Sequence, residues 1–285
     1  MASLQDIRHR IKSVTSTKQI TSAMNMVATS RLRHAKEAAT ANAPYARKVV
    51  EVVGEVAANA GADFSHPLLE QHPDGKRLVF VVTADKGLAG AYSSNACKAA
   101  HALADDGAAT DYFVVGRKGE AYFKNRGCTI VKSYTGISER PVFEHARKIA
   151  IDLIGLYRSG AYREVRMVYT KFISAISCEP QAQKLLPLTM EKKAEAAAPH
   201  AEYIYEPDAA TVLGFLLPQY LDTTVYAALL QSAASELSSR MNAMSNATDN
   251  AEDLIAKLNL HYNKVRQAGI TTELNEIVAG AEGLK

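Results

Sequence analysis

Apolar and small residues recur along the last third of the chain with the spacing of one helix face. Between Asp222 and about Ala281 they fall every three or four residues, at Val225, Leu229, Ala233, Leu237, Met241, Met244, Ala247, Ala251, Ile255, Leu258, Tyr262 and Val265. This spacing predicts one continuous amphipathic helix. A helix of about 60 residues would be roughly 90 Å long, whereas a compact chain of this length has a radius of gyration of about 19 Å. The helix therefore either projects far from the fold or pairs with an equally long partner, and its small residues let another helix approach closely.

A matching stripe at the other end of the chain supplies that partner. It runs through Leu4, Ile7, Ile11, Val14, Lys18, Thr21, Asn25, Ala28, Leu32, Ala35, Ala39, Asn42, Ala46, Val49, Val53 and Val56. The heptad spacing holds for about seven repeats, which indicates a coiled coil. Pro44 lies within the stripe and should kink the helix rather than end it, because the pattern resumes beyond the proline. Lys18, Thr21 and Asn25 put polar side chains in neighbouring layers, which either fix the register or mark where the two helices separate or face a different partner.

The middle of the chain alternates between strand and helix patterns. Leu78–Val82 is a continuous apolar run bounded by turn residues, which is typical of a strand buried on both faces. Further strands are predicted at residues 112–115, 129–131, 165–172 and 183–188, with helices at 91–103, 116–125 and 141–157. Pro141 is expected at position N1 of the last of these helices. The alternation predicts a mainly parallel sheet with helices on its faces.

Together these patterns predict an α/β fold: a long antiparallel coiled coil of the N- and C-terminal helices with an inserted Rossmann-like α/β domain. The N-terminal coiled-coil helix is expected over residues 1–60, the globular α/β domain over 76–190 and the C-terminal coiled-coil helix over 207–285. Pro218 should kink or restart the C-terminal helix.

Positive charge is concentrated on the N-terminal helix. The formal net charge of the chain is only +3, yet seven cations lie between positions 8 and 36 with no acidic residue among them: Arg8, Arg10, Lys12, Lys18, Arg31, Arg33 and Lys36. Such a run indicates an acidic partner, either nucleic acid or an acidic protein surface, unless it is simply a solvated helix face. The three cysteines are scattered without metal-ligand spacing, which is typical of a reducing compartment. Met1 leads almost directly into the helix and no apolar run approaches 18 residues, so we expect neither a signal peptide nor a membrane span.

The turn after the first strand, Asp85–Gly90, invites a nucleotide-binding interpretation. Its glycines do not form G-x-G-x-x-G, and the chain has no G-x-x-x-x-G-K-[ST] motif. Asp85 is either a catalytic carboxylate at the end of a strand or, as is more common, the cap of the following turn. No metal-ligand cluster and no Ser/His/Asp constellation stands out. We therefore expect no catalytic residue, no cofactor and no metal ion, and a mechanical or assembly function rather than an enzyme.

Two other classes of function remain open at this point. A coiled-coil nucleic-acid-binding protein would explain the basic run, but the C-terminal helix carries Glu236, Asp249, Glu252, Asp253, Glu273 and Glu276, which argues against it. A Rossmann-like nucleotide enzyme would explain the turn after the first strand.

Three blocks of sequence carry a resemblance to a known family. The first comprises Ile7–Ile11 and Lys18–Ala28, the second Thr83–Gly90 with Asn95, and the third Ala227–Glu236, Arg240–Met244, Ala247–Asn250 and Tyr262–Ala281. On these blocks the chain closely resembles the gamma subunit of bacterial F-type ATP synthases, and the likeness covers essentially the whole chain.

The resemblance implies a central rotor shaft that couples proton flow through the membrane c ring to ATP synthesis or hydrolysis at the alpha/beta catalytic ring. The shaft would be a non-catalytic subunit, peripheral to the cytoplasmic face of the bacterial cell membrane, with the alpha and beta subunits, the epsilon subunit and the c ring as partners. It implies neither nucleic acid as a partner nor insertion into the membrane.

The resemblance also implies which residues touch those partners. Arg240, Gln267, Thr271 and Glu273 match positions that touch the catch loops of beta, and Met24 lies in the segment near the acidic lever of beta. Tyr203, Tyr205 and Glu206 match the foot of the shaft, which faces the c ring and epsilon.

Overall fold

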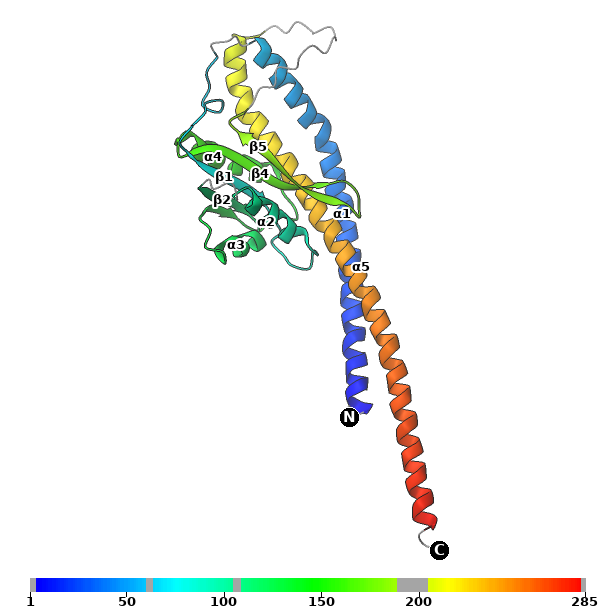
Figure 1. The fold of residues 1–285 in the computed structure, drawn as a ribbon. Coiled ribbons are helices and arrows are strands. Elements are labelled where there is room, and N and C mark those ends of the chain that lie inside the picture. Colours follow the sequence, from blue (N-terminus) through cyan, green and yellow to red (C-terminus); the bar gives the residue numbers. More distant parts are fainter. Residues whose placement is uncertain (1–3, 60–63, 105–108, 189–204, 283–285) are drawn as a thin grey trace. The chain divides into compact units, whose positions relative to one another are not determined.

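The computed structural model describes residues 4–59, 64–104, 109–188 and 205–282. The elements follow in the order α1 (Leu4–Asn59), β1 (Lys76–Val82), α2 (Tyr92–Ala102), β2 (Thr110–Val115), α3 (Arg117–Lys124), β3 (Ile130–Tyr134), α4 (Phe143–Arg158), β4 (Tyr162–Phe172), β5 (Cys178–Leu186) and α5 (Ala209–Glu282). This confirms the predicted fold class of two long terminal helices with an α/β domain between them (Figure 1).

The chain forms two compact units, and each long helix contributes to both. One unit contains residues 29–240, with the sheet and the shorter helices; the other contains residues 1–28 and 241–285.

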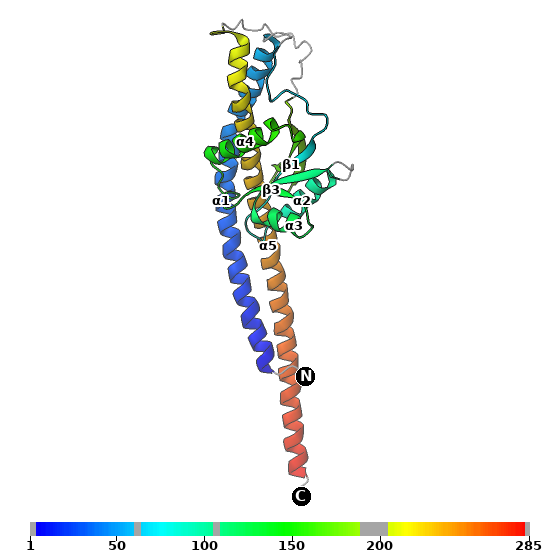
Figure 2. The same cartoon turned by 90° about the vertical axis from the view of Figure 1, so that its left-hand side faces the viewer.

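The larger unit is built on a five-stranded sheet with the order β3-β2-β1-β4-β5. All neighbouring strands are parallel except β5, which is antiparallel to β4. Alternation along β1 explains why its sequence is apolar throughout. Leu78 and Phe80 share a core with residues of α4 and α5, whereas Val79 and Val81 share a second core with residues of α2 and α3. Helices therefore cover both faces of the sheet (Figure 2).

Helix α5 is enclosed on almost every side over residues 228–240. Strand β4 continues past the end of β1, so some of its backbone groups have no strand to pair with, and side chains of α5 bond to them instead. Ser232 Oγ accepts the Thr170 N–H at 3.3 Å, Ser235 Oγ donates to the Thr170 carbonyl at 3.1 Å, and Gln231 Oε1 accepts the Phe172 N–H at 3.1 Å. These bonds meet the requirement that buried backbone polar groups be paired, and they explain why serines lie in a buried stretch of helix.

In the smaller unit, α1 and α5 pair in antiparallel orientation. Arg8 donates to the Tyr262 hydroxyl at 2.7 Å, Lys18 pairs with Glu252 at 3.1 Å, and the Thr248 hydroxyl bonds to the Thr21 hydroxyl at 2.8 Å. Residue numbers therefore rise along one helix as they fall along the other, which confirms the predicted orientation.

The polar layer of the stripe does not separate the two helices. Thr21 is buried within the pair and Lys18 is partnered across it. Of the interpretations of this layer, a role in fixing the register fits these contacts, since Lys18 and Thr21 each meet a polar partner on the opposite helix.

Two details differ from the prediction, and a third prediction is narrowed. Strand β5 begins at Cys178, five residues before the expected start, because only Leu185 and Leu186 near its end are buried and the rest of the strand gives no apolar signal. Helix α4 begins at Phe143 with Val142 as its N-cap, so Pro141 is not at N1. Of the kink or restart expected at Pro218, the restart does not occur, since α5 runs through Pro218 from Ala209.

The start of α5 has a local cause, and α1 passes through Pro44 as predicted. The side chain of Asp208 accepts the Thr211 N–H at 2.8 Å, which caps the first turn of α5 more than a turn before Pro218. Helix α1 continues without interruption through Pro44, as the persistence of the heptad pattern predicts.

Gly116, between β2 and α3, is required by both its backbone angle and its surroundings. Its φ is +97°, and a Cβ there would lie 2.3 Å from the Thr83 carbonyl oxygen. Thr83 is fully buried, and its hydroxyl donates to the Val115 carbonyl at 2.7 Å and accepts the Gly119 N–H at 2.9 Å. Thr83 thus joins the ends of β1 and β2 to the start of α3.

Gly116→Ala should lower the free energy of unfolding by about 2 kcal/mol or more, because it adds backbone strain to an overlap with fixed backbone atoms. The control is Gly127→Ala, where φ is +68° but nothing lies within 4 Å of the added Cβ. The control should cost only about 1 kcal/mol. Urea denaturation followed by circular dichroism measures both, and equal losses would show that the packing against Thr83 contributes nothing.

A cysteine pair at Thr21 and Thr248, in a chain whose native cysteines are replaced by serine, should form a disulfide on mild oxidation. The two hydroxyls are only 2.8 Å apart, so the side chains already meet. The product should run as a monomer on a non-reducing gel. Thr17→Cys with Thr248→Cys is the control, since Thr17 is exposed and bonds only along its own helix. Dimers alone from the first pair would mean that these helices pair between chains.

Candidate functional site

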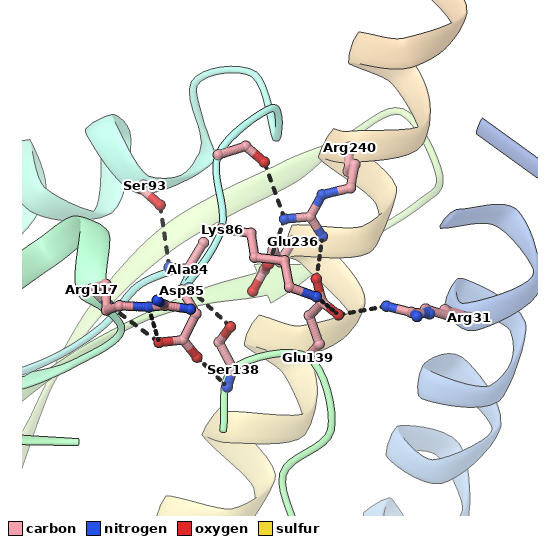
Figure 3. Close-up of polar contacts among 11 residues, drawn as sticks. Arg31, Ala84, Asp85, Lys86, Ser93, Arg117, Ser138, Glu139, Glu236 and Arg240 are labelled. Atoms are coloured by element: carbon pink, nitrogen blue, oxygen red, sulfur yellow. Dashed lines mark hydrogen bonds and ion pairs between the residues drawn. The ribbon is translucent and has the colours of Figure 1, made fainter. Parts of the chain in front are cut away.

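Asp85, in the turn after β1, is the carboxylate for which the sequence allowed a catalytic role. Its side chain is 6% exposed. The Ser138 N–H donates to Oδ2 at 3.1 Å and the Arg117 N–H donates to Oδ1 at 3.3 Å, while the N–H of Asp85 donates to Ser138 Oγ at 3.0 Å (Figure 3). These contacts join the turn to the start of α3 and to the loop before α4. Asp85 is thus a structural carboxylate, as the turn-capping interpretation predicts.

The same contacts determine the ionisation of Asp85. Burial opposes its ionisation, but hydrogen bonds from the backbone of Gly136, Ser138 and Arg117 and from the Ser138 hydroxyl outweigh it. They hold the pKa of this carboxyl below its ordinary value. Asp85 is therefore ionised at neutral pH and serves as an acceptor.

The place where a Rossmann-like sheet receives its ligand is taken by α5. In open α/β sheets ligands bind beyond the carboxyl ends of the strands where the strand order reverses. Here that place lies between β1 and β4, where Ser232 and Ser235 bond to Thr170. The turn after β1 therefore faces α5.

Five charged side chains meet beside this turn and form what we call the Glu139 cluster: Arg31 of α1, Lys86 of the turn after β1, Glu139 of the loop before α4, and Glu236 and Arg240 of α5 (Figure 3). One Glu139 oxygen accepts from Arg31 at 2.6 Å and from Lys86 at 3.0 Å. Its other oxygen lies 3.2 Å from Arg240 Nη1. Three separate segments are thus tied to one carboxylate.

Glu236 lies at the buried end of the cluster. Its side chain is fully buried, and Arg240 Nη2 donates to it at 2.7 Å. Burial raises the pKa of Glu236 above its ordinary value, although Arg240 acts in the opposite direction. Removing one partner of such a pair costs about 3–5 kcal/mol, because the other charge stays buried and unpaired. Arg240 is accordingly held in place by Glu236 and Glu139.

The residues predicted from the resemblance lie in different parts of the fold. Arg240 belongs to the Glu139 cluster and is 6% exposed. Met24 is half-buried on α1. Gln267, Thr271 and Glu273 are exposed and lie within two turns of α5, where the Thr271 hydroxyl donates to the Gln267 carbonyl at 2.9 Å.

The predicted foot is only partly described. Tyr205 is half-buried and its hydroxyl accepts from Asn59 Nδ2 at 3.1 Å, and Glu206 beside it is exposed. Tyr203 lies outside the described residues.

Sequence reasoning missed Glu139 and Lys86 as members of a site. Lys86 lies within the second block of the resemblance, but no pattern marks it as the partner of an acid more than 50 residues away. Glu139 lies in a loop, where neither periodicity nor a motif singles out a carboxylate.

The last turns of α5 expose a series of apolar side chains. Arg8 lies opposite Tyr262, so the start of α1 at Leu4 lies opposite about residue 266. Beyond that point Ile270, Leu274, Ile277 and Val278 are exposed by 48–68%. Apolar side chains gathered on one exposed segment mark a contact surface.

Comparison with known proteins identifies the family. The family model described as ATP synthase matches residues 3–284. The ATP synthase gamma chain of Symbiobacterium thermophilum is 43% identical over 98% of this chain and 97% of the relative, and that of Desulforamulus reducens is 44% identical over 100% of both. This chain belongs to the ATP synthase gamma chain family.

A solved structure agrees in fold. A chain of the central stalk and c ring of Tetrahymena thermophila mitochondrial ATP synthase is 29% identical, with a TM-score of 0.63 over 80% of this chain and 99% of that chain. The family assignment confirms the resemblance and favours it over the nucleic-acid-binding alternative. Asp85, within the second block of the resemblance, is therefore a structural residue of a gamma chain.

The described part of this gamma chain has neither a membrane-spanning helix nor a metal-binding cluster. Among those residues no helix is both long and apolar enough to cross a bilayer. No group of three or more His, Cys, Asp and Glu side chains in the same residues is placed to hold a metal ion.

Asp85→Asn should lower the free energy of unfolding by about 1–3 kcal/mol near neutral pH, because an amide cannot accept all the bonds that the carboxylate accepts. The pKa of Asp85 is depressed in the folded state, so its contribution is present above the ordinary Asp pKa and is lost as the pH falls through the folded-state value. The difference between wild type and variant should therefore narrow from about pH 5 downwards. Thermal unfolding at several pH values measures it. Asp249→Asn, at an exposed position, is the control; a pH-independent difference for Asp85→Asn would contradict this account.

Proposed function

We propose that this gamma chain is the central rotor shaft of a bacterial ATP synthase. It turns inside the alpha/beta ring, which carries the nucleotide sites, and is itself non-catalytic. The observation that carries the proposal is the exposed end of α5, where Ile270, Leu274, Ile277 and Val278 extend beyond the start of α1. A helix end with apolar side chains that are exposed among the described residues is suited to a cavity lined by another protein.

The residues at this end have the roles that the resemblance implies. Gln267, Thr271 and Glu273 are exposed there and touch the catch loops of beta as the shaft turns. Met24 and the basic run of α1 meet the acidic lever of beta. Arg10, Lys12 and Lys36 of that run form no ion pair with any described residue, so their charge is available to an acidic partner.

The shaft acts by binding differently to the conformers of beta. A rotor can shift the populations of three sites only if each conformer has a different binding free energy for the face presented to it. Within residues 29–240 the Glu139 cluster lies on the side of α5 that faces the turn after β1, so the surface around this part of the helix is asymmetric. Asymmetry of this kind is what lets rotation change the affinity of each site in turn.

The other end of the shaft receives the torque. The foot around Tyr203, Tyr205 and Glu206 binds the epsilon subunit and the membrane c ring, through which protons flow. On this proposal the chain is a peripheral subunit at the cytoplasmic face of the membrane. Proton flow would then drive ATP synthesis, and ATP hydrolysis would turn the shaft in the opposite direction.

Assembly and rotation test the proposal directly. The chain should co-purify with alpha and beta subunits and, when a bead is attached through Lys98→Cys on the exposed side of α2, should rotate in one direction on addition of ATP. The isolated chain should not hydrolyse ATP, and a non-hydrolysable ATP analogue should produce no rotation. Failure to bind the alpha and beta subunits, or ATPase activity of the chain alone, would overturn the proposal.

A further inference from the structure

The Glu139 cluster holds more positive than negative charge on its open side. Arg31, Lys86 and Arg240 are its three cations, and Glu139 and Glu236 are its two carboxylates, which leaves one positive charge in excess. The side chains of Arg31 and Lys86 are 49% and 59% exposed. Solvent and partners therefore meet two cations, and both are held by the same oxygen of Glu139.

The buried half of the cluster already pairs within the chain. Arg240 is 7% exposed at its side chain and already pairs with the fully buried Glu236. Losing that pair would leave a buried charge uncompensated, which is costly. Any exchange of partners must therefore take place at Arg31 and Lys86, where the ion pairs are exposed and weak.

The backbone next to Glu139 is fixed, so that its carboxylate occupies the place beside Arg31 and Lys86 that the carboxylate of a partner would take. Its neighbour Ser138 is fixed by Asp85 through two hydrogen bonds of 3.0 and 3.1 Å. The Glu139 side chain itself is 14% exposed. A carboxylate fixed in this way presents its oxygen to both exposed cations without further loss of side-chain freedom.

We propose that Glu139 is an internal competitor for the acidic partner of the shaft. It occupies Arg31 and Lys86 until a carboxylate of the alpha/beta ring takes its place, and it recaptures both cations when the ring moves on. The occupant is an acidic protein segment, because the exposed side carries excess positive charge and Arg31 belongs to a basic run without acids. This inference rests on the proposed function. Glu139 acts through Arg31 and Lys86 and is a positioning residue.

Competition has a mechanical consequence. Two exposed cations with no internal partner would hold a partner carboxylate at one angle of rotation. A carboxylate in the same chain lowers the net gain from each new contact, since one ion pair is exchanged for another. Contacts of this kind can form and break during each turn, because no single angle of rotation has a much lower free energy than the others.

Zero-length crosslinking with a carbodiimide detects the exchange, because the reagent joins an amine to a carboxylate only where the two touch. In the isolated chain Lys86 should crosslink to Glu139, which lies 3.0 Å away. In the complex with alpha and beta subunits that product should fall by about two- to five-fold, and a crosslink from Lys86 to a partner carboxylate should appear. The control is the pair Lys132–Asp152, 2.7 Å apart on β3 and α4, whose yield should not change.

Two variants separate competition from a purely structural role. Glu139→Gln keeps the size of the side chain but removes its charge, so the yield of Lys86 crosslinks to the partner should rise by about two- to five-fold. Glu139→Asp keeps the charge and should restore the wild-type yield. The gain should shrink between about 50 mM and about 300 mM salt, because screening weakens exposed pairs. If Glu139 only clamped the fold, its removal would loosen the site and lower the partner yield.

The outcomes are distinct from those that test the shaft itself. A wild-type chain that never binds the alpha and beta subunits refutes the proposed function. A chain that assembles while Lys86 stays crosslinked to Glu139 at the same yield, with no partner product, refutes only the competitor. A lower partner yield in Glu139→Gln refutes it as well.

Discussion

The structure depends on the burial of one segment of helix from all sides. Residues 228–240 of α5 are almost all buried, and some of their side chains bond to the sheet. Purely apolar side chains could be buried equally well, but they would leave the backbone of β4 without partners beyond the end of β1. Ser232 and Ser235 resolve the conflict, because a hydroxyl is small enough for a helix interface and bonds to the Thr170 backbone.

Ion pairs add to the hydrogen bonds that the serines of α5 make with the sheet. Glu236 and Arg240 follow on the same helix, and Glu139 extends the ion pairs to α1 and to the turn after β1. Asp85 stabilises this arrangement indirectly, since it fixes the loop from which Glu139 projects. The second block of the resemblance is therefore explained by folding: its carboxylate organises loops, and its lysine belongs to an ion cluster.

Much of the fold could be predicted because its elements have strong periodicity. Every position of the α1 stripe is at least half-buried, including Lys18 and Asn25, and the run Leu78–Val82 is a strand buried on both faces. Strand β5 could not be placed accurately, since an edge strand with Pro180 and few buried residues has little apolar signal. The Glu139 cluster could not be predicted at all, because its members come from four separate segments and meet only through the fold. Gln267, Thr271 and Glu273 are predicted as contact residues only from the resemblance. The sequence pattern of an exposed helix face does not separate a residue that contacts a partner from one that contacts solvent.

The bonds between α5 and β4 also fix an angle. Successive residues of an α-helix are turned by about 100° from each other, so a shift of one residue along α5 would carry Ser232 away from Thr170. The sheet would then lose hydrogen bonds that complete its own backbone pairing. Within residues 29–240 the rotation of α5 about its own axis is consequently fixed relative to the sheet. Neither element can turn relative to the other while both stay folded. The sheet therefore cannot rotate about α5 without breaking these hydrogen bonds, and a torque applied to the sheet is transmitted directly to the helix.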